Sequence, residues 1–174
     1  MSVVVRLAGA EEARGRVSEL AEVLVDCVAG GASVSFLAGL TQDRASEFWR
    51  GVIDGVERRE RILLVAEDGE GGSWMGTVQV ILAQPENQPH RADVAKMLVH
   101  RRARRKGMGE QLMRAAEEAA RAAGKTLLVL DTVTGSEAER LYVRLGWERV
   151  GVIPDYALWS DGRPCPTTYF YKRI

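Results

Sequence analysis

The chain contains little that would indicate a metal site, a nucleic-acid partner or a membrane. Its 174 residues include 2 cysteines, Cys27 and Cys165, and 2 histidines, which are too few and too widely spaced for a metal site. The 24 basic and 24 acidic side chains cancel, so no net charge attracts nucleic acid or an anionic membrane. The apolar runs are far shorter than a bilayer span, and residues 1–6 lack the features of a signal peptide. We therefore expect a cytoplasmic, metal-free protein that binds neither nucleic acid nor membrane.

The patterning predicts one mixed α/β domain over residues 1–174. The chain is 46% hydrophobic and 28% charged, which is ordinary for a soluble globular domain. Apolar residues at helical spacing, and short β-branched or alternating runs, then divide the chain into elements. The helical stripes cover 17–28, 45–56, 108–123 and 138–145, and the strands cover 3–7, 62–66, 74–82, 93–99, 127–130, 147–152 and 167–171.

Local signals refine these elements. Thr41 is placed to cap the second helix, and Ser136 and Glu139 have the spacing of a capping box. Along the strand 93–99, alternation places Asp93, Ala95, Met97 and Val99 on one face. Residues 154–166 are rich in glycine, proline and aromatic side chains and show no periodicity, so we expect an irregular segment there.

The most informative stretch is the basic turn Arg104-Arg105-Lys106-Gly107-Met108-Gly109, between a predicted strand and a predicted helix. The first N–H groups of a helix have no intrahelical partners, and the helix dipole adds partial positive charge there. Glycine allows the main chain to approach a ligand closely and to adopt positive φ values. The turn therefore indicates a binding site for an anion such as a phosphate.

Two motifs together resemble the GNAT N-acetyltransferase superfamily. One is Arg-x-x-Gly-x-Gly at 104–109, and the other is Ala-x-x-Leu-Tyr-x-x-Leu-Gly-Trp at 138–147. The resemblance covers essentially the whole chain and implies the GNAT fold, a mostly antiparallel sheet that splays between its fourth and fifth strands and is flanked by helices. The chain departs from the family at Gly135, where many members carry an asparagine that contacts the cofactor. Either Ser136 supplies that hydrogen bond or the contact is absent.

The resemblance also implies acetyl-CoA as cosubstrate and a set of residues that bind it. The main chain of the last strand residues before the turn would pair with the pantetheine amides. The turn and the helix start would hold the pyrophosphate. The cofactor-binding residues predicted in this way are Met97, Leu98, Val99, Arg104, Arg105, Lys106, Gly107, Met108, Gly109, Glu110 and Ser136.

Tyr142 and Asp131 are the predicted catalytic residues. The resemblance implies that Tyr142 donates a proton to the departing thiolate, whereas its helical spacing alone favours a core tyrosine. Asp131 follows the strand 127–130, where it could bind the acceptor's ammonium group or accept its proton; the alternative is a residue that caps the turn. Asp93 is a second candidate base, and Tyr156 either lines the acceptor pocket or belongs to an ordinary loop.

A narrower resemblance, to tabtoxin-resistance acetyltransferases, implies a small, amino-acid-like acceptor. It is carried by His90-Arg91-Ala92-Asp93-Val94-x-Lys96, Leu130-Asp131-Thr132 and the tail 150–167. The predicted reaction is direct, sequential transfer of acetyl from acetyl-CoA to a primary amine, in a role such as detoxification of a toxin or antibiotic. Acetylation of proteins or peptides, and an acyl-CoA sensor without turnover, remain alternatives. A homodimer would fit the superfamily.

Overall fold

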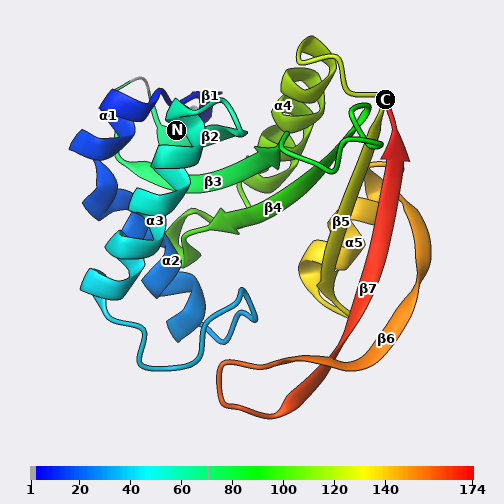
Figure 1. Ribbon diagram of the computed structural model, residues 1–174. Coiled ribbons are helices and arrows are strands. Elements are labelled where there is room, and N and C mark those ends of the chain that lie inside the picture. The colour runs from blue at the N-terminus through cyan, green and yellow to red at the C-terminus, as the bar shows by residue number, and fades with distance from the viewer. Residues whose placement is uncertain (1–2, 70) are drawn as a thin grey trace.

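In the computed structural model, residues 3–69 and 71–174 are described, and they form one seven-stranded sheet with helices on both faces (Figure 1). The strand order is β1-β2-β3-β4-β5-β7-β6. The strands are β1 (Val3–Leu7), β2 (Arg61–Asp68), β3 (Trp74–Ile81), β4 (Arg91–Val99), β5 (Leu127–Val133), β6 (Glu148–Leu158) and β7 (Pro164–Arg173). The helices are α1 (Ala10–Gly15), α2 (Val17–Ala29), α3 (Gln42–Glu57), the short 3₁₀ helix η1 (Arg101–Ala103), α4 (Met108–Ala122) and α5 (Glu137–Arg144).

The sheet divides where β4 meets β5. Within the described part of the chain this is the one parallel pair, and it covers only Arg91–Asp93 against Leu127–Val129. Beyond this point β4 remains paired with β3 and β5 remains paired with β7, so the two central strands diverge. The mostly antiparallel sheet with a splay between its fourth and fifth strands is therefore confirmed.

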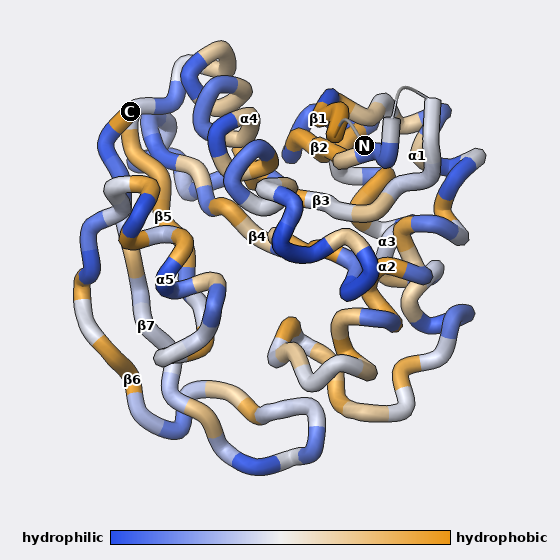
Figure 2. The backbone as a smooth tube through the Cα atoms, turned by 180° about the vertical axis from the view of Figure 1, so that it is seen from behind, coloured by the Kyte–Doolittle hydropathy of each residue, from blue (hydrophilic) through white to orange (hydrophobic). Residues whose placement is uncertain are grey.

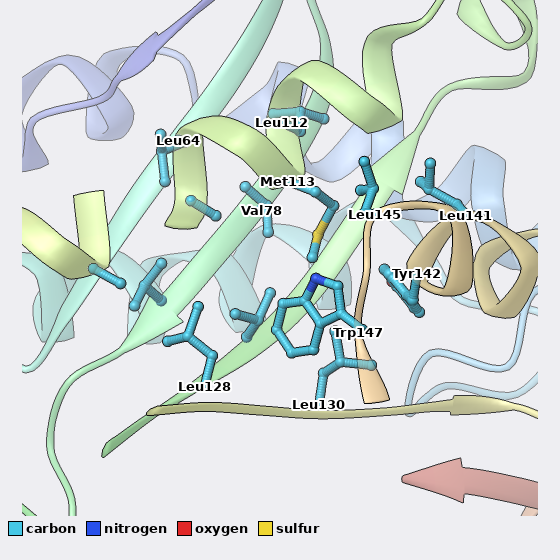
Figure 3. Packing of buried hydrophobic residues seen from close by; sticks show 14 of the residues in the cluster. Leu64, Val78, Leu112, Met113, Leu128, Leu130, Leu141, Tyr142, Leu145 and Trp147 are labelled. Atoms are coloured by element: carbon cyan, nitrogen blue, oxygen red, sulfur yellow. The ribbon is translucent and has the colours of Figure 1, made fainter. Parts of the chain in front are cut away.

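Two hydrophobic clusters lie on opposite faces of the sheet. The residues of β2 alternate between them, with Leu64 packing toward α4 and α5 and Leu63 packing toward α1, α2 and α3. Figure 3 shows the first cluster, in which Met113 of α4 and Leu145 at the C-terminal end of α5 gather over Leu130 and Val78 of the sheet. This packing fixes α5 against the strands beside the splay.

A β-bulge in β4 overturns the prediction that Asp93, Ala95, Met97 and Val99 share one face. Between the pairs Thr77–Leu98 and Gln79–Ala95, β4 holds one residue more than β3. Lys96, the residue at this point, has a φ of 50°. The extra residue turns Met97 and Val99 to the face of the α4 cluster and Leu98 to the other. Alternation in the sequence cannot show an inserted residue.

The other differences from the predicted elements concern segments without strong apolar periodicity. Helix α1 was not predicted, because in its six residues only Ala13 is buried. Strand β5 continues through Asp131, beyond the predicted end at residue 130. The segment 154–166 is mostly strand, since β6 and β7 form a long hairpin, but the pairing is irregular between Ile153 and Ala157 and residues 159–163 form the turn. Strand β6 lies at the sheet edge and is exposed along almost its whole length, which explains both the missing alternation and the tolerated Pro154.

Both predicted helix caps are present. The Thr41 hydroxyl accepts a hydrogen bond from the N–H of Arg44 at 3.3 Å, and the Ser136 hydroxyl accepts one from the N–H of Glu139 at 3.1 Å. The Glu139 carboxylate in turn accepts from the N–H of Gly135. The caps fix where α3 and α5 begin.

Glu117 of α4 is a buried carboxylate that joins three elements, with only 5% of its surface exposed. It accepts hydrogen bonds from Trp147 Nε1 at 3.0 Å and from Lys172 Nζ at 2.9 Å. Replacing it with alanine would leave the indole N–H and the ammonium group without this partner. We expect Glu117→Ala to lower the free energy of unfolding by about 3 kcal/mol, measured by urea denaturation. The neighbouring, exposed Glu118→Ala should change it little; equal stability of both variants would contradict this role.

Candidate active site

A cavity of about 1220 Å³ opens where β4 and β5 diverge. Its walls come from the α2–α3 connection, the later half of β4, the turn after η1, the end of β5, the start of α5 and the end of β6. Pockets for single small ligands measure roughly 300–1,000 Å³. The cavity therefore has room for a long ligand and a smaller second one.

One end of the cavity is formed by the N-terminus of α4. The helix begins at Met108, and Gly107 before it has a φ of 75°, in the left-handed region that favours glycine. A Cβ atom at Gly109 would lie 3.2 Å from Leu141 Cδ2, so glycine here allows α4 and α5 to approach closely. The first N–H groups of α4 have no intrahelical partners. These N–H groups are the hydrogen-bond donors of the predicted anion site.

The arginines before α4 point in different directions from this strongly hydrophilic connection between β4 and α4, drawn in blue in Figure 2. Arg101 turns away to α2, where its N–H and its Nε donate to Asp26 at 2.8 and 2.9 Å. Arg104 and Arg105 line the cavity, whereas the exposed Lys106 does not. Arg105 lies 3.7 Å from Glu137 in an exposed ion pair.

The predicted pantetheine-binding segment, Met97–Val99, lies along the cavity. The Val99 carbonyl oxygen does not face β3; it accepts from Arg104 Nε at 3.1 Å and from Cys27 Sγ at 3.5 Å. Because β4 has parted from β5 here, the main chain on this side of the strand has no neighbouring strand. This leaves an open strand edge of the kind that an extended ligand can join.

Tyr142 of α5 is 5% exposed and lines the cavity. Its ring packs against Trp147 and Phe170, with centroids 6.2 and 6.1 Å apart, as Figure 3 shows in part. No hydrogen bond joins its hydroxyl to another residue of the described chain. Burial and the negative charge of Asp131 raise the pKa of Tyr142 above its ordinary value of 10. The hydroxyl thus stays protonated at neutral and mildly alkaline pH and is available as a donor to a ligand.

Asp131 lies inside β5, next to the point where β4 leaves it, and lines the same cavity. Leu130 before it faces the core, so the strand's alternation turns Asp131 to the open side. Although the carboxylate reaches solvent in the cavity, the protein mass around it removes part of its hydration and raises the pKa of Asp131, an effect that Lys96 opposes.

Sequence reasoning gave Lys96 no role, but the structure places it in the cavity wall. Lys96 lies at the β4 bulge, which interrupts the alternation by which the sequence would assign it to one face of the strand. Its Nζ donates to Ser35 Oγ at 3.0 Å and lies 5.7 Å from the centre of the Phe48 ring. A basic residue between the apolar residues Ala95 and Met97 of the strand was the available signal.

The remaining predicted site residues are distributed unevenly. Ser136 lines the cavity, but its hydroxyl already caps α5. Tyr156 lines the cavity and shares a 2.6 Å hydrogen bond with Tyr169. Asp93 does not line it; its carboxylate is held by an ion pair with Arg91 and by Gln84, which donates at 3.0 Å. Only Asp131 of the two candidate bases therefore reaches the cavity.

The end of the cavity opposite α4 is closed by two segments distant in sequence. The α2–α3 connection and the turn between β6 and β7 lie side by side (Figure 1). Ser33 Oγ donates to the carbonyl of Leu158 at 2.6 Å, and the N–H of Ala38 donates to the carbonyl of Ser160 at 2.7 Å. This contact gives the cavity an enclosed end next to Lys96, whose Nζ donates to Ser35 of the α2–α3 connection.

A scan against family models matches residues 59–149 to the acetyltransferase (GNAT) domain. That range is more than half of the chain and includes β4, the basic turn, Asp131 and Tyr142. The chain belongs to the GNAT acetyltransferase family. The membership confirms the prediction of an acetyl-CoA-dependent acetyltransferase.

Solved structures with the same fold cover nearly all of this GNAT chain. A putative acetyltransferase from Salmonella typhimurium, determined with its cofactor acetyl-CoA, is 18% identical, with a TM-score of 0.79 over 99% of this chain and 94% of its own. A phosphinothricin acetyltransferase from Sinorhizobium meliloti in complex with acetyl-CoA is 16% identical, with a TM-score of 0.79 over 100% and 89%. A ribosomal-protein-alanine N-acetyltransferase from Brucella melitensis is 20% identical, with a TM-score of 0.80 over 98% and 99%. At these identities the likeness concerns the fold.

Two further observations concern ions and membranes. Among the residues that the structure describes, no group of three His, Cys, Asp or Glu side chains could hold a metal ion. No helix in the described ranges is long and apolar enough to cross a membrane.

Proposed function

We propose that this GNAT enzyme transfers an acetyl group from acetyl-CoA directly to the primary amine of a small molecule in the cavity between β4 and β5. The observation that carries the proposal is the common cavity of Tyr142 and Asp131, which come from α5 and β5 and face a space that begins at the N-terminus of α4. An acid, a group for the amine and an anion site are thereby brought together.

The residues around the cavity fit acetyl-CoA. The α4 N-terminus at Gly107–Gly109, with Arg105 beside it, offers N–H donors and positive charge for the pyrophosphate. The open edge of β4 at Met97–Val99 offers main-chain groups for the pantetheine amides. When bound in this way, acetyl-CoA supplies a thioester whose carbonyl carbon is the electrophile for the amine.

Tyr142 serves as the general acid in this proposal. Transfer to an amine requires a proton for the departing thiolate, and a phenol whose pKa is raised holds its proton at neutral pH. The hydroxyl has no protein partner among the described residues, so donating to the sulfur costs no existing hydrogen bond. Packing against Trp147 and Phe170 fixes the ring's direction.

Asp131 positions the acceptor and assists its deprotonation. A carboxylate that has lost part of its hydration gains more from pairing with an ammonium group than one in bulk water does. Its raised pKa also makes it a better proton acceptor than a free aspartate. Both effects favour an amine as the nucleophile, because the amine must be bound and must lose a proton.

The enclosed end of the cavity favours a small acceptor over a protein. The hydrogen bonds of Ser33 to Leu158 and of Ala38 to Ser160 hold the α2–α3 connection against the end of β6 and the turn after it, and both segments line the cavity. A wall on this side leaves less room for a peptide chain than for a small molecule. The phosphinothricin acetyltransferase among the similar structures is compatible with a small acceptor, and the ribosomal-protein enzyme represents the alternative of a protein acceptor. A role in detoxification and the narrower likeness to tabtoxin-resistance enzymes remain predictions. A sensor without turnover would have no need of both Tyr142 and Asp131 in one cavity.

We expect Asp131→Asn to reduce kcat/KM for the acceptor while leaving the affinity for acetyl-CoA nearly unchanged. The loss should be about tenfold or more for alkylamines, which are ammonium ions at neutral pH, and smaller for anilines, which are uncharged. Steady-state kinetics with both acceptor types, together with calorimetry for acetyl-CoA, measure this. Equal, small losses of kcat/KM for both acceptor types would show that Asp131 has only a structural role.

Thermal melting also distinguishes a functional charge at Asp131 from a structural, turn-capping role. Its pKa is higher in the folded protein than in the unfolded chain, so the ionised carboxylate makes the fold less stable at pH 7. Asp131→Asn should therefore raise the Tm at pH 7, and this gain should shrink as the pH falls through the raised pKa of Asp131. A turn-capping aspartate would instead give a lower Tm when replaced.

A further inference from the structure

Lys96 and Asp131 place opposite charges on the walls of one cavity without closing on each other. The Nζ of Lys96 donates to Ser35 Oγ at 3.0 Å and not to Asp131. Each charge nevertheless acts on the other: Asp131 raises the pKa of Lys96 and Lys96 lowers that of Asp131, although burial dominates the shift of both groups. Two partly dehydrated, unlike charges thus face the same space and are both short of a direct ionic partner.

The position of Lys96 depends on unusual backbone geometry. Lys96 has a φ of 50° in the β4 bulge, and its partner Ser35 has a φ of 78° in the α2–α3 connection. Non-glycine residues seldom adopt positive φ, and such conformations concentrate at sites of function. Here two of them meet through one hydrogen bond at the enclosed end of the cavity.

The side of the cavity on which Lys96 lies is the acceptor side. Its neighbours Ser35 and Phe48 belong to the α2–α3 connection and to α3, whereas the predicted phosphate donors belong to the start of α4. Arg61, which is held to Gln79 by a 2.9 Å hydrogen bond, acts on Lys96 as a second positive charge. An anion beside Lys96 would be attracted by both cations.

We infer that Lys96, supported by Ser35, binds a carboxylate of the acceptor, so that the substrate class is a zwitterionic amino acid whose amine faces Asp131. This inference rests on the proposed function and adds the second charged group of the substrate. An acceptor with an ammonium and a carboxylate group neutralises both walls at once, while a simple amine leaves Lys96 without an anion. Lys96 is then a specificity-determining residue, and it takes no part in the chemical step.

Paired acceptors test this inference. Glycine and the standard L-amino acids with a primary α-amine are compared with the matching amino acid amides, which keep the amine and the side chain but lack the α-carboxylate. Thiol release from acetyl-CoA is measured for the wild-type enzyme and for Lys96→Met. Because amidation also lowers the pKa of the amine, each acceptor is compared only with itself between the two enzymes.

The expected result is that wild type acetylates one or more free amino acids, and that Lys96→Met lowers their kcat/KM about 10- to 100-fold, the range for loss of a charge-assisted hydrogen bond. The loss on the matching amides should be at least tenfold smaller. Lys96→Arg should retain the preference for the acid in part, because it keeps the charge. Arg50→Met removes a positive charge from the exposed side of α3 and should leave the ratio of acid to amide unchanged.

Two results would overturn the inference, and they differ from each other. If wild type acetylates amides or simple amines but not the acids, or if Lys96→Met affects acids and amides equally, the carboxylate subsite is wrong and the proposed amine acetylation stands. If no amine of either series releases thiol, the proposed function fails together with the inference. In each case, an affinity for acetyl-CoA equal to that of wild type, measured by calorimetry, shows that the variant is folded.

Discussion

Tyr142→Phe is expected to lower kcat about 10²- to 10⁴-fold while acetyl-CoA binds as tightly as before. The substitution removes only the hydroxyl, which makes no hydrogen bond within the described chain, and it keeps the ring contacts with Trp147 and Phe170. Stability should therefore change little. The missing function is the proton for the departing thiolate, so the loss appears in the chemical step and not in binding.

Single-turnover measurements under conditions where chemistry limits the rate test this loss. Tyr171→Phe is the matched control, because it removes a hydroxyl that hydrogen-bonds Glu148 at 2.5 Å on the sheet edge, away from the cavity. It should leave kcat close to wild type. A Tyr142→Phe enzyme with full single-turnover activity would show that Tyr142 is only a packing residue.

Gly107→Val should weaken acetyl-CoA binding about tenfold or more, which corresponds to about 1.4 kcal/mol or more of binding free energy. Gly107 has a φ of 75° at the cap of α4, and a β-branched residue is strained there. Its new side chain would also add bulk to a residue that lines the cavity, 3.8 Å from Gln111 Nε2. Both effects displace the N–H donors from a phosphate.

Gly124→Val provides the matched control for this substitution. Gly124 follows the other end of α4 and has a φ of 79°, and beyond its chain neighbours no heavy atom of the described residues would lie within 4 Å of a Cβ atom there. The two variants therefore carry the same backbone strain, but only one carries it at the proposed phosphate site. Calorimetry should give a weakened complex for Gly107→Val and a nearly normal one for Gly124→Val; similar affinities for the two would remove the loop from the binding site.

The sequence predicts those features of the fold that depend on local chemistry. Thr41 and Ser136 cap their helices because a hydroxyl at that position meets the free N–H groups of the first turn. Gly107 has the positive φ for which a glycine before a helix is suited. The family motifs add the arrangement in space, which places the N-terminus of α4 beside the splay of β4 and β5.

Features that depend on contacts between distant segments could not be predicted in this way. The bulge at Lys96 is defined by the register of β4 against β3, and Lys96 lines the cavity. The partner of Lys96 is Ser35, 61 residues earlier in the chain. The sequence predicts strand β6 too short, because an exposed edge strand has no buried face that would impose an alternating pattern. Asp93 stayed a second candidate base from the sequence, because only the folded structure shows that Arg91 and Gln84 hold its carboxylate outside the cavity.

The measurement that tests the central claim most directly is the fate of the acetyl group when enzyme, acetyl-CoA and small primary amines are mixed. The account predicts that thiol release and N-acetylated amine, the latter quantified by mass spectrometry, appear in equal amounts, and that no acetyl group remains on the protein. It would be contradicted by an enzyme that binds acetyl-CoA yet releases no thiol with any small amine, or that acetylates only peptide N-termini or lysines.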